Sequence, residues 1–109
     1  METFHGRAHI PGFIGDSTIE LDIDWLGKEV YLRLPNAPGG INDWPGLMVQ
    51  TIGVEEAVFR TKGIPPLFTH WWHLVRGGED ELWGFVVANP DKDGVWQTCS
   101  IHLEKAKQE

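Results

Sequence analysis

The sequence predicts an all-β fold, either a small antiparallel barrel or a strongly curved sandwich of about 7–8 strands, with at most one short helix. Apolar and polar residues alternate with a period of two over much of the chain, which is typical of half-buried strands. Short stretches rich in Gly, Pro, Asn and Asp separate these segments, as hairpin loops do. A chain of 109 residues fits one domain, so we expect residues 1–109 to form a single unit.

Residues 18–25 show the clearest alternation and predict a strand with one apolar face. That face carries Ile19, Leu21, Ile23 and Trp25. A second strand is expected after Gly27 and Lys28, because glycine suits the first central position of a type II′ hairpin turn. A two-residue turn at this point places Ile23 opposite Leu32.

The N-terminal residues 3–10 predict a strand that pairs with 18–25 in antiparallel register, with Phe4 opposite Trp25. This register sets three pairs of opposite charge against each other: His5 with Asp24, Arg7 with Asp22, and His9 with Glu20. Cross-strand pairs of this kind contribute about 0.2–1 kcal/mol each. We therefore expect the basic residues of the first strand and the acidic residues of the second to share the solvent face.

The middle of the chain predicts a loop followed by two strands. Residues 35–46 contain three prolines and three glycines, so we expect an irregular loop with Trp44 packed inward. Residues 47–54 predict a strand. Residues 55–62 fit either another strand or a short helix, and the alternation of their apolar residues favours the strand.

The last three expected strands cover residues 67–75, 81–89 and 95–103. Two glycines, Gly77-Gly78, predict the first turn between them, and the sequence Asp91-Lys92-Asp93-Gly94 predicts a second turn rather than a calcium loop. The first two strands are apolar on both faces, and the turn at the glycines sets Trp72 against Trp83 and His70 against Phe85. One side of the sheet then carries Phe68, His70, Trp72, Trp83, Phe85 and Trp96, with His102 at its margin.

An apolar patch of this size exceeds what monomeric proteins normally leave exposed, so we expect a cover. The first choice is the loop 35–46, which would lay Trp44 over the patch. The second is a homodimer interface, because aromatic enrichment and few charges characterise interface centres. The third is a small apolar or sugar ligand. In each case the sequence predicts that Trp72, Trp83 and Phe85 are mostly buried.

Charge and composition restrict the class of partner. The chain has 16 Asp and Glu against 9 Lys and Arg, a formal charge of −7. This balance argues against nucleic acid and is compatible with a basic protein partner. The N-terminal residues do not resemble a secretory signal, and no apolar run approaches about 18 residues, so we expect a cytoplasmic protein with no membrane partner. The single cysteine, Cys99, excludes an internal disulfide and is expected to be a small buried apolar residue.

Catalytic and metal-binding motifs do not stand out in the sequence. It contains no H-x-H, H-E-x-x-H or C-x-x-C motif, and His70 and His73 point to opposite faces of a strand, so we expect no metal and no cofactor. A pair of His5 and Asp24 beside Tyr31 has the chemistry of a general base, but no nucleophile accompanies it. No catalytic residue is assigned, and an enzyme is less expected than a binding protein.

The function that these features predict is binding without catalysis, through the aromatic sheet face. The protein would be either a homodimer or an inhibitor- or immunity-type protein that binds a basic partner. The alternative is a small-molecule carrier or enzyme with a pocket lined by Trp and His side chains.

Overall fold

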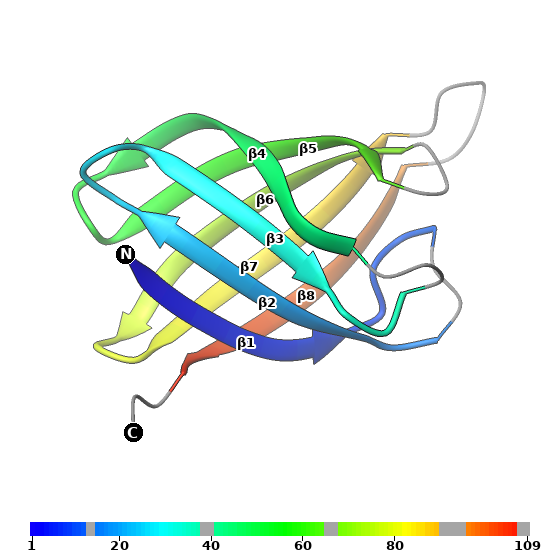
Figure 1. Ribbon diagram of the computed structural model, residues 1–109, viewed down its shortest axis with the longest axis horizontal. Coiled ribbons are helices and arrows are strands. Elements are labelled where there is room, and N and C mark those ends of the chain that lie inside the picture. Colours follow the sequence, from blue (N-terminus) through cyan, green and yellow to red (C-terminus); the bar gives the residue numbers. More distant parts are fainter. Residues whose placement is uncertain (13–14, 38–40, 65–67, 90–95, 107–109) are drawn as a thin grey trace.

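The computed structural model places eight antiparallel strands in a closed barrel, which confirms the small barrel that the sequence predicts (Figure 1). The structure describes residues 1–12, 15–37, 41–64, 68–89 and 96–106. The strands are β1 (Glu2–Ala8), β2 (Ser17–Asp24), β3 (Glu29–Leu34), β4 (Ile41–Ile52), β5 (Glu56–Ile64), β6 (Phe68–Gly78), β7 (Glu81–Asn89) and β8 (Gln97–Lys105). Each strand pairs with the next, and β1 pairs with β8. Within the described ranges, no helix has the length and apolar character needed to cross a membrane.

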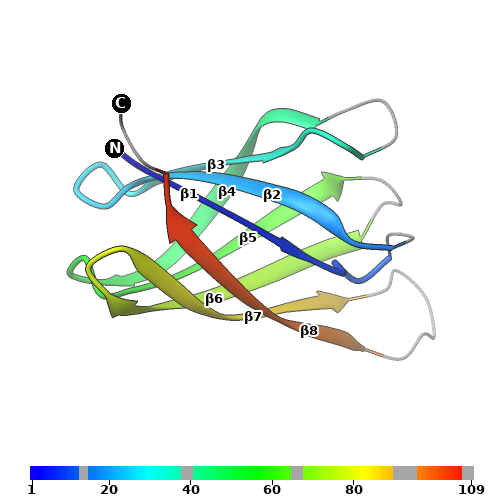
Figure 2. The ribbon, with the colours of Figure 1, turned by 90° about the horizontal axis from the view of Figure 1, so that it is seen from below.

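Inward-pointing side chains fill the interior of the barrel. Figure 2 shows β1–β3 on one wall and β5–β7 on the opposite wall, with β4 and β8 crossing between them. Trp72 is fully buried and stacks on Phe59 with ring centroids 5.6 Å apart. Its Nε1 donates a hydrogen bond to Thr61 Oγ1 at 3.0 Å. Eight strands make a barrel narrow enough for side chains to fill, and these contacts show a packed core.

The N-terminus and the β6–β7 turn lie at the same end of the barrel (Figure 1), and Arg76 lies near this end of β6. Its guanidinium donates hydrogen bonds to three acceptors: Glu2 Oε1 at 2.7 Å, Val54 O at 2.8 Å and Glu79 O. The same group lies 5.8 Å from the ring centroid of Phe4 and 5.4 Å from that of Trp25. One cation thus ties β1 to two turns while covering two core rings.

The pairing of β1 with β2 confirms the shared solvent face but corrects the expected register. The observed pairs include Phe4 with Leu21, His5 with Glu20 and Arg7 with Thr18. They replace the expected pairs Phe4–Trp25, His5–Asp24 and Arg7–Asp22, which are wrong. His9 lies beyond the end of β1, so its expected place opposite Glu20 is also wrong. The register changes by an even number of residues, so the same side chains still point outward.

The turn between β2 and β3 accounts for a second register correction. It spans residues 25–28 instead of the expected two, and Lys28 takes the left-handed region at φ 56°. Ile23 therefore pairs with Val30 and not with Leu32. A longer loop that ends on a left-handed residue is a common way to join two twisted strands.

Strand β4 begins inside the segment that the sequence predicts to be a loop, so that prediction is wrong for residues 41–46. A bulge accommodates the unfavourable residues. The pairing passes from Leu34–Ile41 to Leu32–Trp44, and Asp43 has φ 45°. Bulges allow proline and glycine to be tolerated near a strand because they interrupt the ladder of hydrogen bonds. The predicted strand at 55–62 is confirmed as β5.

Trp44 packs against the core as expected, but it does not cover the aromatic patch. Its side chain is half-buried, and its Nε1 donates a hydrogen bond to the backbone oxygen of Lys62 at 3.0 Å. Because β4 pairs with β3 and β5, Trp44 lies away from β7 and β8. The expected cover of the patch by residues 35–46 is therefore wrong.

The side of β6 that faces the barrel interior is the opposite of the one that the sequence predicts. Gly77-Gly78 remain in the strand, and the turn is at residues 79–80. Trp72 lies opposite Val86 and not opposite Trp83. The register therefore differs from the predicted one by an odd number of residues, which exchanges the inward and outward faces of β6. The inward side chains of the strand are His70, Trp72 and Leu74, and the outward ones are Trp71, His73 and Val75.

The β7–β8 pair keeps the predicted faces. Trp83 and Phe85 point outward, and Val86 lies opposite Cys99. Cys99 packs against the core, and burial raises the pKa of its thiol. Cys99 is partly and not fully buried, so the expectation of a small buried apolar residue holds only for its packing against the core. The expected turn at residues 91–94 lies outside the described residues.

Arg33 organises the acidic outer face of β2. Its guanidinium donates hydrogen bonds to the carboxylates of Asp22 at 2.6 and 2.9 Å, Glu20 at 2.9 Å and Asp43 at 3.0 Å. The hydrogen bonds from Arg33 are the largest effect and lower the pKa of Asp22. Burial is the next largest and opposes them, and a bond from Thr3 lowers the pKa further. The ionised form of Asp22 is therefore favoured more in the folded than in the unfolded chain.

We expect this linkage to appear as a loss of stability in acid. Because the folded pKa of Asp22 is depressed, its contribution is complete above about pH 4 and is lost as the pH falls through the folded pKa. Asp22→Asn should lower the free energy of unfolding at about pH 6, and its difference from the wild type should shrink progressively as the pH falls below about 4. Urea unfolding at about pH 6 and at about pH 3 measures this. The matched control is Asp16→Asn, at an exposed acid, which should lose as much stability between the two pH values as the wild type does. If Asp22→Asn also loses as much stability in acid as the wild type, the role of the Arg33 contact is contradicted.

Candidate functional site

The outward side chains of β6, β7 and β8 form an exposed aromatic surface. We call it the aromatic outer face and define it by Val75, Trp83, Phe85, Ser100 and His102, with Arg7 of β1 beside them. The exposed fractions of Val75, Trp83 and Phe85 are 43%, 49% and 53%. Trp83 and Phe85 are thus about half exposed in the single chain, so their expected burial would require a second chain or a ligand.

The structure gathers only part of the predicted site on this face. Trp83, Phe85 and His102 are there, whereas the other predicted residues lie elsewhere. Trp72 is in the core, His70 is buried with its Nε2 2.8 Å from the backbone oxygen of Pro11, Trp44 is on β4, and Trp96 is exposed at the opposite end of the β7–β8 pair. The side chain of Phe68 lies outside the described residues. The expected pocket that joins Trp72 to Trp83 is consequently not formed.

Two residues of β6 that the sequence analysis assigned to the wrong side replace His70 and Trp72. His73 is paired with Glu56 of β5, and its ring meets that of Phe85 edge-on at 6.3 Å. Trp71 lies under the guanidinium of Arg60, 5.6 Å from the ring centroid. The two-sided apolar character of β6 was the only sequence signal for them.

Trp83 is exposed but held in one position. Its ring stacks on the imidazole of His102, with centroids 3.8 Å apart and an interplanar angle of 15°. Its Nε1 donates a hydrogen bond to Glu81 Oε2 at 3.3 Å. On another side it contacts Gly77, where an added Cβ would lie 2.2 Å from Trp83 Cδ1. Glycine at position 77 thus makes room for the indole, and three neighbours fix its orientation.

The aromatic outer face contains a shallow hollow of about 590 Å³. Its lining residues are Arg7, Val75, Trp83, Gly84, Phe85, Ser100, Ile101 and His102. Val75, Trp83 and His102 form a row across the neighbouring strands, and the antiparallel order of β8 and β1 brings Arg7 to the same level. The hollow is mainly apolar, with the guanidinium of Arg7, the hydroxyl of Ser100 and the imidazole of His102 as polar groups.

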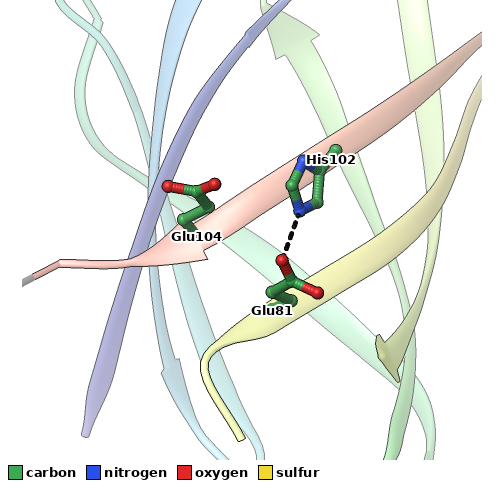
Figure 3. Close-up of side chains that lie close together, drawn as sticks. All are labelled: Glu81, His102 and Glu104. Atoms are coloured by element: carbon green, nitrogen blue, oxygen red, sulfur yellow. Dashed lines mark ion pairs between the residues drawn. The ribbon is translucent and has the colours of Figure 1, made fainter. Parts of the chain in front are cut away.

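Next to the hollow, Glu81, His102 and Glu104 lie close together on the β7–β8 pair (Figure 3). One ligand atom from each residue lies within 4.8 Å of those of the other two. His102 Nε2 faces Glu81 Oε1 at 3.4 Å, and within the described chain this nitrogen has no hydrogen-bond partner. His102 and Glu104 are two apart on one strand face, a visible sequence signal. The third residue comes from the neighbouring strand, which is why sequence motifs missed the group.

The expected general-base pair is not present, because His5 lies opposite Glu20 and not opposite Asp24. Comparisons with known proteins found no matching protein family, no matching curated protein and no matching solved structure. The proposals below therefore depend on the geometry of the chain itself.

Proposed function

We propose that this barrel is a non-catalytic binding module that associates with a second copy of itself through the aromatic outer face. The observation that carries the proposal is Trp83, which is half exposed and yet fixed by Gly77, His102 and Glu81. A side chain that is already ordered loses little entropy when a partner covers it. Tryptophan is also among the residues most enriched where interfaces gain their affinity.

The charges around the hollow favour a second copy over a strongly basic partner. Arg7 lies in the hollow and makes no ion pair with the residues that the structure describes, whereas Glu81 and Glu104 lie at its margin. A face that carries both signs is able to pair with its own image across a two-fold axis. A basic protein would meet Arg7 as a like charge, although the net charge of −7 would attract it at long range.

A small-molecule ligand in the same hollow is the second candidate function. The volume of about 590 Å³ falls in the range of small-molecule sites, about 300–1,000 Å³. Trp83 and Phe85 offer flat apolar surfaces, and Arg7 and Ser100 offer hydrogen-bond donors. A planar or sugar-like ligand would fit these groups.

The decisive prediction compares two exposed apolar residues, one on β7 and one on β4. Phe85→Glu should convert a dimer into a monomer, because a charge at the centre of an interface is desolvated without a partner. Leu47→Glu on β4 is the matched control, since Leu47 is 55% exposed and Phe85 53%. It should leave the dimer intact. Sedimentation equilibrium over a range of protein concentrations measures both masses.

Three outcomes would contradict self-association through this face. The wild type could be monomeric at every concentration, Phe85→Glu could remain dimeric, or Leu47→Glu could dissociate the dimer. A monomeric wild type whose tryptophan fluorescence responds to a sugar or aromatic ligand, with the response lost in Phe85→Glu, would favour the small-molecule function instead.

A further inference from the structure

We propose that Glu81, His102 and Glu104 bind one zinc ion on the outside of the barrel (Figure 3). This inference goes beyond self-association and does not rest on it; His102 belongs to both, since its ring stacks on Trp83 while its Nε2 faces Glu81. The ligand set is one imidazole nitrogen and two carboxylates. Zinc accepts this mixture of donors, whereas calcium and magnesium prefer oxygen alone.

The spacing of the donor atoms fits zinc. Zinc binds nitrogen and oxygen at about 2.0–2.2 Å in a tetrahedral arrangement, which separates neighbouring ligand atoms by about 3.3–3.5 Å. His102 Nε2 and Glu81 Oε1 are 3.4 Å apart. That separation is long for a hydrogen bond, and it matches one edge of a zinc tetrahedron. Glu104 is exposed, so a rotation of its side chain can bring a carboxylate oxygen to the third position.

The neighbours of the group orient its ligands before any ion arrives. Stacking on Trp83 fixes the plane of the His102 ring, and a metal in that plane leaves the stacking intact. The Trp83 Nε1 donates to Glu81 Oε2, while Glu81 Oε1 faces the histidine. Such contacts behind the ligands typically raise metal affinity by about 10–100-fold.

Electrostatics also favours a cation here. Glu81 and Glu104 lie directly opposite each other in the β7–β8 ladder, where like charges destabilise a sheet. A divalent ion with two carboxylates and a neutral imidazole forms a group with no net charge. Three protein ligands leave the fourth zinc position to water.

The test uses the full chain without a histidine tag and stripped of metal. Calorimetric titration with zinc should show one ion bound per chain, and cobalt should give the absorption of a tetrahedral site with nitrogen and oxygen ligands. His102→Gln and Glu104→Gln should each weaken zinc binding by at least about tenfold. Circular dichroism checks the fold, and Glu104→Gln is the safer variant because its side chain is exposed.

The matched control is His73→Gln, because His73 and Glu56 form a second histidine–carboxylate pair on the outside of the barrel. This variant should bind zinc as the wild type does. Phe85→Glu should also retain zinc binding, which separates this proposal from self-association. The zinc site is refuted if the wild type binds no zinc, if His102→Gln or Glu104→Gln binds it unchanged, or if His73→Gln loses it equally.

Discussion

Trp72→Ala is expected to lower the free energy of unfolding by about 3–5 kcal/mol, the cost of truncating a large core aromatic side chain. Trp72 is fully buried inside the barrel, where it stacks on Phe59. The truncation also leaves the Thr61 hydroxyl without the indole hydrogen bond, in a position that is itself fully buried. Chemical unfolding in urea, monitored by circular dichroism, measures the difference.

The adjacent tryptophan is the natural control for this prediction. Trp71 points outward, and the guanidinium of Arg60 lies over its ring. An exposed cation–π contact contributes about 0.5–1 kcal/mol. Because Trp71 is partly buried, Trp71→Ala should also lose some burial, but it should cost clearly less than Trp72→Ala. Equal losses in the two variants would show that β6 does not present the faces seen in the structure.

Arg76→Met should lower the free energy of unfolding by about 3 kcal/mol, because it removes the cation that ties three parts of one barrel end together. The side chain of Arg76 is 10% exposed and that of Glu2 is 24% exposed. Burial alone would oppose ionisation of Glu2, but the bonds from Arg76 and Lys105 outweigh it and lower the pKa of Glu2. Without Arg76, the Glu2 carboxylate and the Val54 carbonyl lose a strong donor.

Two further variants separate charge from geometry at this position. Arg76→Lys keeps the charge but lacks the planar fork that reaches three acceptors, so its stability should fall between those of the wild type and Arg76→Met. Arg60→Met removes a guanidinium that stacks on an outward tryptophan, and it should cost about 1 kcal/mol or less. If Arg76→Lys is as stable as the wild type, positive charge alone accounts for the effect of Arg76.

Most of the secondary structure, apart from residues 41–46, and much of the sidedness could be predicted from the sequence. Alternation along residues 18–25 placed Ile19 and Leu21 in the core, and the predicted pairing of residues 81–89 with 95–103 placed Trp83 and Phe85 on one outward side. These assignments held because the two-residue period of a strand is a local property. An even error in register leaves every side chain on its correct face.

Only the tertiary structure decided how the strands align. The turn at residues 25–28, the bulge beside Asp43 and the late turn at 79–80 each changed a register, and the last one changed it by an odd number. For β6, whose residues are apolar on both sides, the sequence offered no alternation to identify the buried face. Trp72 went inward because a closed barrel needs a large side chain beside Phe59 to fill its centre.

The candidate site was likewise predicted in part from the sequence and decided in part by how the strands align. That Trp83, Phe85 and His102 share one outward side could be predicted, because the β7–β8 pair keeps the predicted faces. The group of Glu81, His102 and Glu104 was missed, because its residues come from two paired strands and a motif search along one strand does not show them together. Their contact depends on the register between β7 and β8. It is a property of the whole sheet, since strand register is set by turns, bulges and closure together and not by the residues of one strand.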